Sequence, residues 1–321
     1  MFGRSGSDVV DVSTMVGSVA LASPIMTAAG TAGHGAELAA YFDLSTLGAV
    51  VVKSLAPYPW DGNPPVRVHQ TPSGMINSVG LQGPGVERWM NDELPDLEEA
   101  GATVIASIWG GTVDDYRRAA EMLADAPASV AAVEVNISCP NTEHGNELFA
   151  HSCALTEEVI AATEACGRPR WAKLSPNVGP TLPDIAAAAR DAGAEAVTIS
   201  NTYFGLSIDP VTRRPRIGAG LDGRGPGRAG GVSGPAIHPL AVKAVADVRA
   251  AHPDLPIVAA GGVATIEDVI EFALVGASAV QVGTATFNDP GTCGRLTTDL
   301  PRWCAKHRVQ RFGELVGAAR Y

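Results

Sequence analysis

The sequence lacks several features that would fix a location or a partner at once. No apolar run reaches the roughly 18 residues that a membrane span needs, and the opening MFGRSGSDVVDVSTMVGS holds no continuous apolar segment of a signal peptide. Positive charge is scarce, because 23 lysines and arginines face 34 aspartates and glutamates and leave a net charge of −11. Such a balance argues against an unaided binder of nucleic acid or of an anionic membrane. We therefore expect a soluble, cytoplasmic protein.

Paired cysteines and recognisable metal-ligand motifs are missing as well. The five cysteines are Cys139, Cys153, Cys166, Cys293 and Cys304, and no two of them form a CxxC motif. A zinc site or an iron–sulfur cluster held by this chain alone is therefore not expected. The histidines show no strong metal-ligand spacing, and no GxSxG motif occurs. These absences argue against a metalloenzyme and against a serine hydrolase.

What the sequence does contain is a repeated alternation of apolar runs and amphipathic segments. Apolar residues make up 46% of the 321 residues, which is enough for a substantial core. Strands are predicted at Ile25–Ala29, Ala49–Lys53, Thr103–Ile108, Ala132–Ile137, Trp171–Leu174, Ala196–Ser200, Ile257–Ala260 and Ala279–Val282. Helices are predicted at Val113–Leu123, Thr156–Ala165, Leu182–Ala192, Pro239–Ala251 and Ile266–Leu274. Eight strand–helix units predict a single (β/α)₈ TIM barrel domain over residues 1–321.

A doubly wound parallel sheet is the rival architecture. It would need a GxGxxG turn that opens a helix after an early strand. The glycine-dense stretch GAGLDGRGPGRAGG at 218–231 comes late and follows no predicted strand, so we interpret it as a loop. Four strands begin after a glycine–alanine step, as in AGAEAVTIS, which is typical of a helix end that turns into a buried strand. The barrel remains the better interpretation.

The barrel interpretation places candidate functional residues at the C-terminal ends of the strands, with phosphate held after strands 7 and 8. Strand 7 runs into Gly261 and Gly262, and strand 8 into Gly283 and Thr284. Glycine loops expose backbone N–H groups and let a phosphate approach closely. The alternative is that these are simple strand-to-helix turns. Two such loops at the expected strands favour a ligand that carries phosphate.

Two lysines follow apolar strands. Lys53 ends the run AVVV, and Lys173 follows Trp171 on a strand whose alternation directs it towards the barrel mouth. A lysine at the end of a buried strand is costly without an anionic partner. The alternative for Lys53 is an ammonium that extends to the rim. Both lysines facing one cavity would favour a negatively charged ligand.

The densest polar segment is NISCPNTEHGN at 136–146, after strand 4. Asn136, Cys139 and Asn141 lie there, and Asn77 and Asn201 add further amides. Side-chain amides both donate and accept hydrogen bonds, which suits a planar heterocycle. Cys139 could act as a base or nucleophile if its thiolate is stabilised. The alternative is an Asx turn with an inert thiol.

At this point the residues resemble a known family. The segments AAGTAGHG, LGAVVVKS, GNPPVRV, GMINSVGLQ, NISCPN, KLSPNV, SNT, GGVSGPAIHP, AAGGV and VGTA occur in order between about Pro24 and Asp299. The chain resembles the class 1 dihydroorotate dehydrogenases, most closely the catalytic subunit of the NAD-linked subtype B. The resemblance implies an FMN-containing TIM barrel that oxidises dihydroorotate to orotate in pyrimidine synthesis.

The resemblance also implies residue roles. Cys139 matches the base that removes the C5 proton while hydride passes to the flavin N5, and Lys173 matches the lysine near the flavin N1–C2 edge. The matched substrate ligands are Lys53, Asn77, Val79, Gly80, Leu81, Asn136, Asn141, Asn201 and Thr202. The matched FMN contacts are Ala28, Ala29, Gly30, Lys53, Lys173, Gly234, Gly261, Gly262, Gly283 and Thr284. No metal ligand is implied.

Some positions depart from the family pattern. Gly83 replaces a common asparagine, Trp109 replaces a smaller residue, His238 replaces a common lysine, and the segment 142–151 differs. These departures leave FMN binding as expected but bear on the substrate. Three other functions stay open. They are a dihydropyrimidine dehydrogenase-like oxidoreductase acting on another pyrimidine, a flavin-binding relative that has lost turnover, and a non-flavin barrel such as an aldolase or isomerase.

The electron acceptor is not evident from the sequence. Without a cysteine cluster or a dinucleotide fingerprint, this chain is not expected to pass electrons to NAD by itself. The resemblance implies a homodimer, or a heterotetramer with an electron-transfer subunit that carries FAD and an iron–sulfur centre. Fumarate and quinones remain alternative acceptors.

Overall fold

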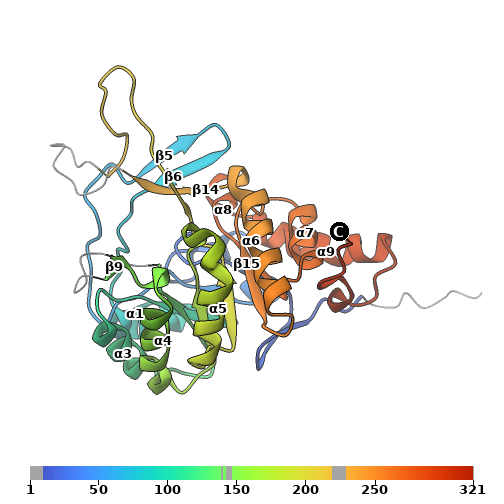
Figure 1. The fold of residues 1–321 in the computed structure, drawn as a ribbon. Coiled ribbons are helices and arrows are strands. Elements are labelled where there is room, and N and C mark those ends of the chain that lie inside the picture. Colours follow the sequence, from blue (N-terminus) through green and yellow to red (C-terminus); the bar gives the residue numbers. More distant parts are fainter. Residues whose placement is uncertain (1–9, 139, 142–146, 219–228, 321) are drawn as a thin grey trace, which may run out of the picture.

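Eight parallel strands form the centre of the computed structural model, which describes residues 10–138, 140–141, 147–218 and 229–320 (Figure 1). They are β3 (Ile25–Thr27), β4 (Val50–Val51), β7 (Val104–Ile108), β8 (Val130–Asn136), β11 (Arg170–Lys173), β12 (Ala196–Ile199), β15 (Ile257–Ala260) and β16 (Ala279–Val282). Their order in the sheet is β3-β16-β15-β12-β11-β8-β7-β4. A bridge between Met26 and Ala49 joins the two ends, so the sheet closes as the predicted (β/α)₈ barrel. Each predicted strand is confirmed within a few residues.

The barrel interior is filled in layers, because side chains alternate along each strand. The lowest layer is apolar and packs against a small hairpin of β1 (Thr14–Val16) and β2 (Val19–Leu21). It contains Met26, Val51, Ile105, Ala132, Trp171, Ala196, Val258 and Ala279. Two residues further along four of these strands, the inward positions are polar, namely Glu134, Lys173, Thr198 and Gln281. The apolar plug therefore ends below a buried polar layer.

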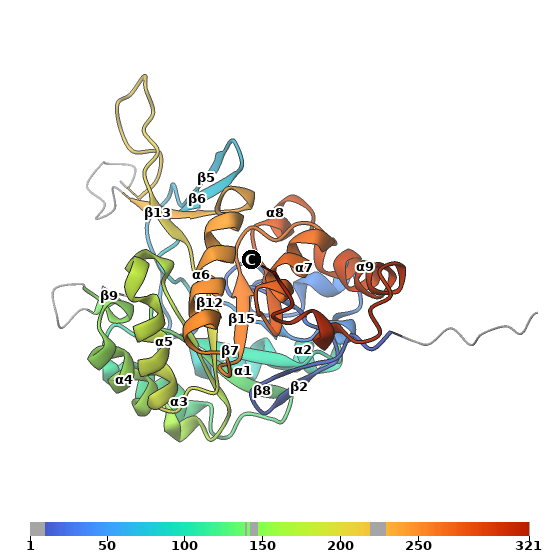
Figure 2. The same ribbon diagram turned by 45° about the vertical axis from the view of Figure 1, so that its right-hand side comes forward.

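Helices surround the barrel (Figures 1 and 2). They are α1 (Val86–Asp92), α2 (Leu94–Glu99), α3 (Val113–Met122), α4 (Cys153–Ala162), α5 (Leu182–Asp191), α6 (His238–Ala251), α7 (Ile266–Leu274), α8 (Ala285–Asn288) and α9 (Thr292–Lys306). Short 3₁₀ turns lie at Glu37–Ala40, Leu44–Thr46, Phe149–His151, Glu164–Cys166, Pro176–Thr181, Pro235–Ile237 and Phe312–Leu315. The five predicted helices are present. Helix α4 starts three residues earlier than predicted, because Ser152 caps it by accepting a hydrogen bond from the Leu155 N–H at 3.3 Å.

The glycines of the glycine–alanine steps are required for two different physical reasons. Gly193 ends the turn after α5 with φ of +99°, a left-handed conformation that glycine adopts readily. Gly48 does not have a positive φ, and a side chain there would instead collide with the carbonyl oxygen of Ser23. The prediction of a sharp turn holds for Gly193, whereas close backbone approach explains Gly48.

A second sheet lies over the mouth of the barrel, and the sequence patterns did not predict it (Figure 2). It is antiparallel, with the order β13 (Tyr203–Gly205), β14 (Gly230–Ser233), β6 (Gly74–Asn77) and β5 (Val68–Thr71). Strand β14 begins inside the stretch 218–231 that we interpreted as a loop, so that prediction is wrong for its last two residues. Residues 219–228 lie outside the described residues. A further two-stranded pair joins β9 (Pro140–Asn141) to β10 (Glu147–Leu148).

In the part of the chain that the structure describes, no helix has the length and apolar character needed to cross a membrane.

Candidate active site

A cleft of about 1140 Å³, partly open to solvent, occupies the C-terminal mouth of the barrel. The strand ends form its base, and the second sheet forms one wall. Its lining includes Ala28, Ala29, Gly30, Lys53, Asn77, Val79, Gly80, Leu81, Asn136, Lys173, Asn201, Thr202, Gly234, Gly261, Gly262, Gly283 and Thr284. These are all the predicted site residues whose side chains the structure describes. Cys139 lies outside the described residues, and only the backbone of Asn141 is described, in β9.

Lys53 follows β4 and stands beside the glycine loop after β3. Its backbone N–H donates to the Gly33 carbonyl at 2.9 Å. A Cβ atom added at Gly30 would lie 3.3 Å from the Lys53 Nζ, so the absence of a side chain at residue 30 gives the ammonium its place. Lys53 is half-buried and lines the cleft. It is therefore positioned to meet an anion that enters from the mouth.

His34 lies close to Lys53 and stays neutral. Burial, followed by the positive charge of Lys53, lowers the pKa of His34 from 6.5 to about 4. The imidazole Nε2 is buried, and it has no hydrogen-bond partner among the described residues. At neutral pH the positive charge at this edge of the cleft is therefore that of Lys53.

The segment Val79–Leu81 is held from behind by the loop that contains Trp60 and Asn63. The Asn63 N–H donates to the Val79 carbonyl at 3.0 Å, and the Trp60 Nε1–H donates to the Gly80 carbonyl at 2.9 Å. In a planar trans peptide the N–H points opposite to the C=O. The N–H groups of Gly80 and Leu81 are thus directed away from that loop, on a segment that lines the cleft.

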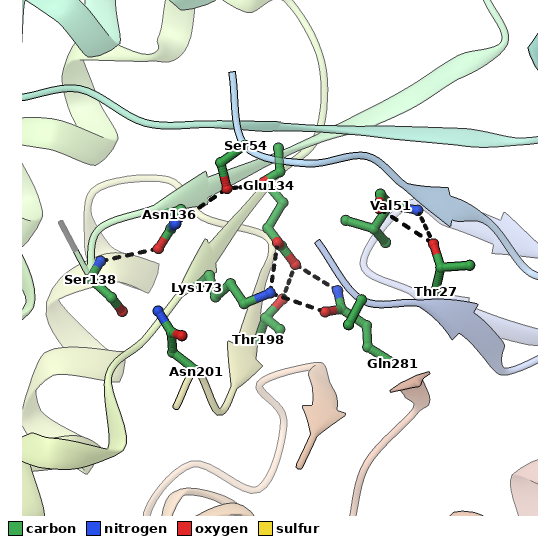
Figure 3. A network of polar contacts seen from close by, with 12 residues as sticks. Thr27, Val51, Ser54, Glu134, Asn136, Ser138, Lys173, Thr198, Asn201 and Gln281 are labelled. Atoms are coloured by element: carbon green, nitrogen blue, oxygen red, sulfur yellow. Dashed lines mark hydrogen bonds and ion pairs between the residues drawn. The ribbon is translucent and has the colours of Figure 1, made fainter. Parts of the chain in front are cut away.

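The asparagines that line the cleft are partly engaged by the protein itself. Asn77 donates its Nδ2–H to the Gly231 carbonyl at 3.2 Å, whereas Asn201 accepts the Thr202 N–H at its Oδ1 at 2.7 Å. Asn136 donates to the Ser54 hydroxyl at 3.2 Å and accepts the Ser138 N–H at 3.3 Å (Figure 3). The amide of Asn77 is held through its nitrogen and that of Asn201 through its oxygen. Asn136 anchors the start of the segment that leads to residue 139.

The floor of the cleft is a buried polar network that sequence reasoning identified only in part (Figure 3). Lys173, 5% exposed, donates to Glu134 at 3.1 Å and to Gln281 at 3.2 Å. Lys173 was predicted from the sequence, whereas Glu134 and Gln281 were not. A carboxylate inside the apolar run AAVEVN was the available signal, because such a group must be paired. Lys173 faces the cleft as expected, but Glu134 balances its charge.

Glycine loops after β14, β15 and β16 converge on one side of the cleft. A Cβ atom added at Gly262 would lie 2.9 Å from the Gly234 carbonyl oxygen and 2.7 Å from the Cβ of His238, so a side chain has no room there. Thr284 donates its hydroxyl to Ser233 at 2.7 Å, which ties the loop after β16 to β14. Closely packed glycine backbone of this kind is suited to a phosphate group.

Gly83, Trp109 and His238, which depart from the family pattern, are not among the residues that line the cleft and lie behind them. Gly83 exchanges two backbone hydrogen bonds of 2.9 Å with Trp60. Trp109, 6% exposed, packs edge-on against Trp60 with ring centroids 6.0 Å apart. His238 contacts the Gly261 carbonyl at 2.9 Å and Glu271 at 3.1 Å, and so braces a glycine loop. Residues 142–146 of the fourth departure lie outside the described residues.

Fold and site together define a class, namely a (β/α)₈ barrel with a mouth suited to a phosphate-bearing cofactor and a planar ligand. The family model described as dihydroorotate dehydrogenase matches residues 12–303. The chain belongs to the dihydroorotate dehydrogenase family, whose members are FMN-dependent oxidoreductases of pyrimidine biosynthesis.

Individual relatives agree with this assignment. The chain is 44% identical over 311 residues to the catalytic subunit of dihydroorotate dehydrogenase B (NAD(+)) from Desulforudis audaxviator, covering 97% of this chain and 98% of the relative. It is 42% identical to the protein of the same name from Listeria innocua, covering 92% and 94%. A relative from Solibacter usitatus, 41% identical with coverage of 97% and 99%, carries the provisional name dihydroorotate dehydrogenase A (fumarate).

The residues present fit FMN. The glycine loops at 234, 261–262 and 283 provide the crowded backbone that a phosphate needs. Lys173 and Gln281 offer polar groups at the floor, and Ala28 and Ala29 add small side chains to the lining.

Proposed function

We propose that this chain oxidises dihydroorotate to orotate in the cleft at the barrel mouth. The convergence of Lys53, the Val79–Leu81 backbone and the asparagine amides on one cleft carries the proposal. A carboxylate, two ring carbonyls and two ring N–H groups are the polar groups of dihydroorotate, and this set of donors and acceptors complements them. Membership of the family supports the same substrate.

Each group has a proposed role. Lys53 and the N–H groups of Gly80 and Leu81 hold the substrate carboxylate, while Asn77, Asn136, Asn201, Thr202 and Asn141 hold the ring. The thiolate of Cys139 removes the proton from C5. Bound FMN supplies the two-electron acceptor for the hydride from C6. The cofactor contacts are Lys173 at the floor, the backbone at Ala28–Gly30 and Gly234, Gly261, Gly262, Gly283 and Thr284 on the phosphate side.

The test is an anaerobic absorbance titration of the purified FMN-loaded protein. Dihydroorotate is expected to bleach the flavin absorbance, whereas dihydrouracil, which lacks the carboxylate, is expected to leave it unchanged at equal concentration. Bleaching by dihydrouracil alone would assign the site to an uncharged pyrimidine. No bleaching by either compound, in protein that retains FMN, would overturn the proposed substrate.

We further propose that electrons leave through a partner subunit carrying FAD and an iron–sulfur centre, in a heterotetramer built on a dimer of this chain. The names of the relatives from Desulforudis audaxviator and Listeria innocua, both catalytic subunits, support this. The substrate-reduced chain alone is then expected to be reoxidised slowly by NAD⁺ and by fumarate. Rapid reoxidation by fumarate would instead indicate a fumarate-linked enzyme, as the name of the Solibacter usitatus relative states.

A further inference from the structure

Glu134 is a fully buried carboxylate at the centre of the polar network beneath the cleft. Its Oε1 accepts a hydrogen bond from the Lys173 ammonium at 3.1 Å. Its Oε2 accepts one from the Thr198 hydroxyl at 3.0 Å and one from the Gln281 Nε2 at 2.6 Å. The three donors come from β11, β12 and β16, so Glu134 ties together opposite sides of the barrel (Figure 3). Three of the roughly four acceptor sites of this carboxylate are therefore filled.

The network fixes the direction of every group in it. Gln281 donates to Glu134 through Nε2 and accepts from Lys173 through Oε1 at 3.2 Å, so a flipped amide would lose both contacts. An ammonium has three N–H groups. Among the described residues, Glu134 and Gln281 take two of those of Lys173. Since Lys173 also lines the cleft, its third N–H is available to a ligand on the floor.

The charges of the pair also matter. A buried ammonium without a counter-ion strongly destabilises the fold. Paired with a carboxylate, as Lys173 is with Glu134, it belongs to a unit whose net charge is zero. The cleft floor therefore presents the positive end of a fixed ion pair rather than a full extra charge. Removing the carboxylate while keeping the ammonium would increase the positive potential at the floor.

We infer that Glu134 is a positioning residue that holds the Lys173 ammonium on the cleft floor and offsets part of its positive potential. The reduction potential of bound FMN is then lower than it would be with Lys173 alone. The inference rests on the placement of Lys173 beside the cofactor in the proposed function. Reduced flavin carries more negative charge than oxidised flavin, so an unbalanced cation favours the reduced form.

The experiment is a reductive titration of FMN-loaded protein with dithionite and a reference dye, which needs no substrate. E134Q is expected to raise the equilibrium constant for two-electron reduction at least tenfold, a shift of about 30 mV or more towards positive potential. T198V is the matched control, because it removes one hydrogen bond to the same carboxylate and keeps its charge. Its potential is expected to stay within about 10 mV of the wild type, a twofold change in that constant.

E134D provides a second reading if E134Q does not accumulate as folded protein. E134D keeps the negative charge but moves the carboxylate away from Lys173 by one carbon–carbon bond. The FMN reduction potential is therefore expected to shift in the same direction as in E134Q, by a smaller amount. An unchanged or lowered potential in both variants, with FMN still bound, would overturn the inference. Bleaching of the wild type by dihydroorotate would then leave the proposed function intact. A shifted E134Q in a protein that dihydroorotate does not bleach would overturn only the proposed substrate.

Discussion

Trp60 donates its indole N–H to the carbonyl oxygen of Gly80 at 2.9 Å, and this contact orients a segment that lines the cleft. Fixing that carbonyl also fixes the Leu81 N–H on the opposite side of the peptide. In W60F the ring packing against Trp109 is largely retained and the donor is lost. Because one net hydrogen bond is worth about 1 kcal/mol, we expect the orotate dissociation constant to rise about fivefold.

The measurement is the perturbation of the flavin spectrum by orotate, with FMN affinity determined in parallel. W303F is the matched control, since Trp303 stacks on His307 at 4.1 Å in α9 and is not among the residues that line the cleft. Orotate binding should be unchanged in W303F. If W60F bound orotate as tightly as the wild type, the Gly80 carbonyl would not be the contact that orients the carboxylate donors.

Lys53 should discriminate ligands by their carboxylate. Hydrogen bonds to charged groups contribute about 1.5–3 kcal/mol each, so K53A is expected to weaken orotate binding by roughly 10- to 100-fold. Uracil, which has no carboxylate, should lose much less affinity, and FMN should remain bound. K243A serves as control, because Lys243 is exposed in α6 and pairs with Asp247. Equal losses for orotate and uracil would make Lys53 a structural lysine.

Cys139 is expected to set the rate at which dihydroorotate reduces the flavin. A general base contributes about 10²- to 10⁴-fold to a rate, so C139A should slow flavin reduction by dihydroorotate by a factor in that range. C139S should be affected less, since a hydroxyl retains some capacity to accept the proton. Stopped-flow absorbance measures the rate, and C153A is the control, because Cys153 is exposed at the start of α4. Near-normal reduction in C139A would remove Cys139 from the mechanism.

The barrel could be predicted because its signals are local. Each strand is a short apolar run whose two faces are both buried, as Val135 and Val197 are against the helices. Helix ends were less certain, because a cap such as Ser152 shifts a boundary without changing the periodicity. The second sheet escaped prediction because its strands are short and partly exposed. Their pairing of Gly231 with Asn77 spans 154 residues, which no local pattern encodes.

The site was predictable at positions where family motifs and strand ends coincide, and Lys53 and Gly262 are examples. Glu134 and Gln281 were missed because their role depends on contacts across the barrel, between strands far apart in the sequence. The alternation of inward positions offered a usable signal, since Ala132 is followed two residues later by Glu134, and Ala279 by Gln281. Polar residues at inward positions of two strands are expected to face each other. Such a pairing can be predicted only once the barrel is known to close.

His34 should make the stability of the protein depend on pH. Its pKa is about 4 in the folded protein against 6.5 ordinarily, because burial and then the Lys53 charge disfavour the imidazolium. Below pH 6.5 the His34 imidazole is protonated in the unfolded chain, whereas in the folded chain it is protonated only below about pH 4. The free energy of unfolding therefore falls as the pH drops from 6.5 to 4. With a discount for partial exposure, the loss is about 1–2 kcal/mol.

Urea denaturation of the FMN-loaded protein at pH 7.5 and 4.5 measures this loss. H34Q cannot titrate in this range, so between the two pH values it should lose about 1–2 kcal/mol less than the wild type. H307Q, which removes an exposed imidazole in contact with Trp303, should lose as much as the wild type. If H34Q and H307Q showed the same pH dependence, His34 would keep its ordinary pKa of 6.5 in the folded protein. Below that pH the edge of the cleft would then carry a second positive charge beside Lys53, and K53A alone would understate how strongly this edge attracts the carboxylate.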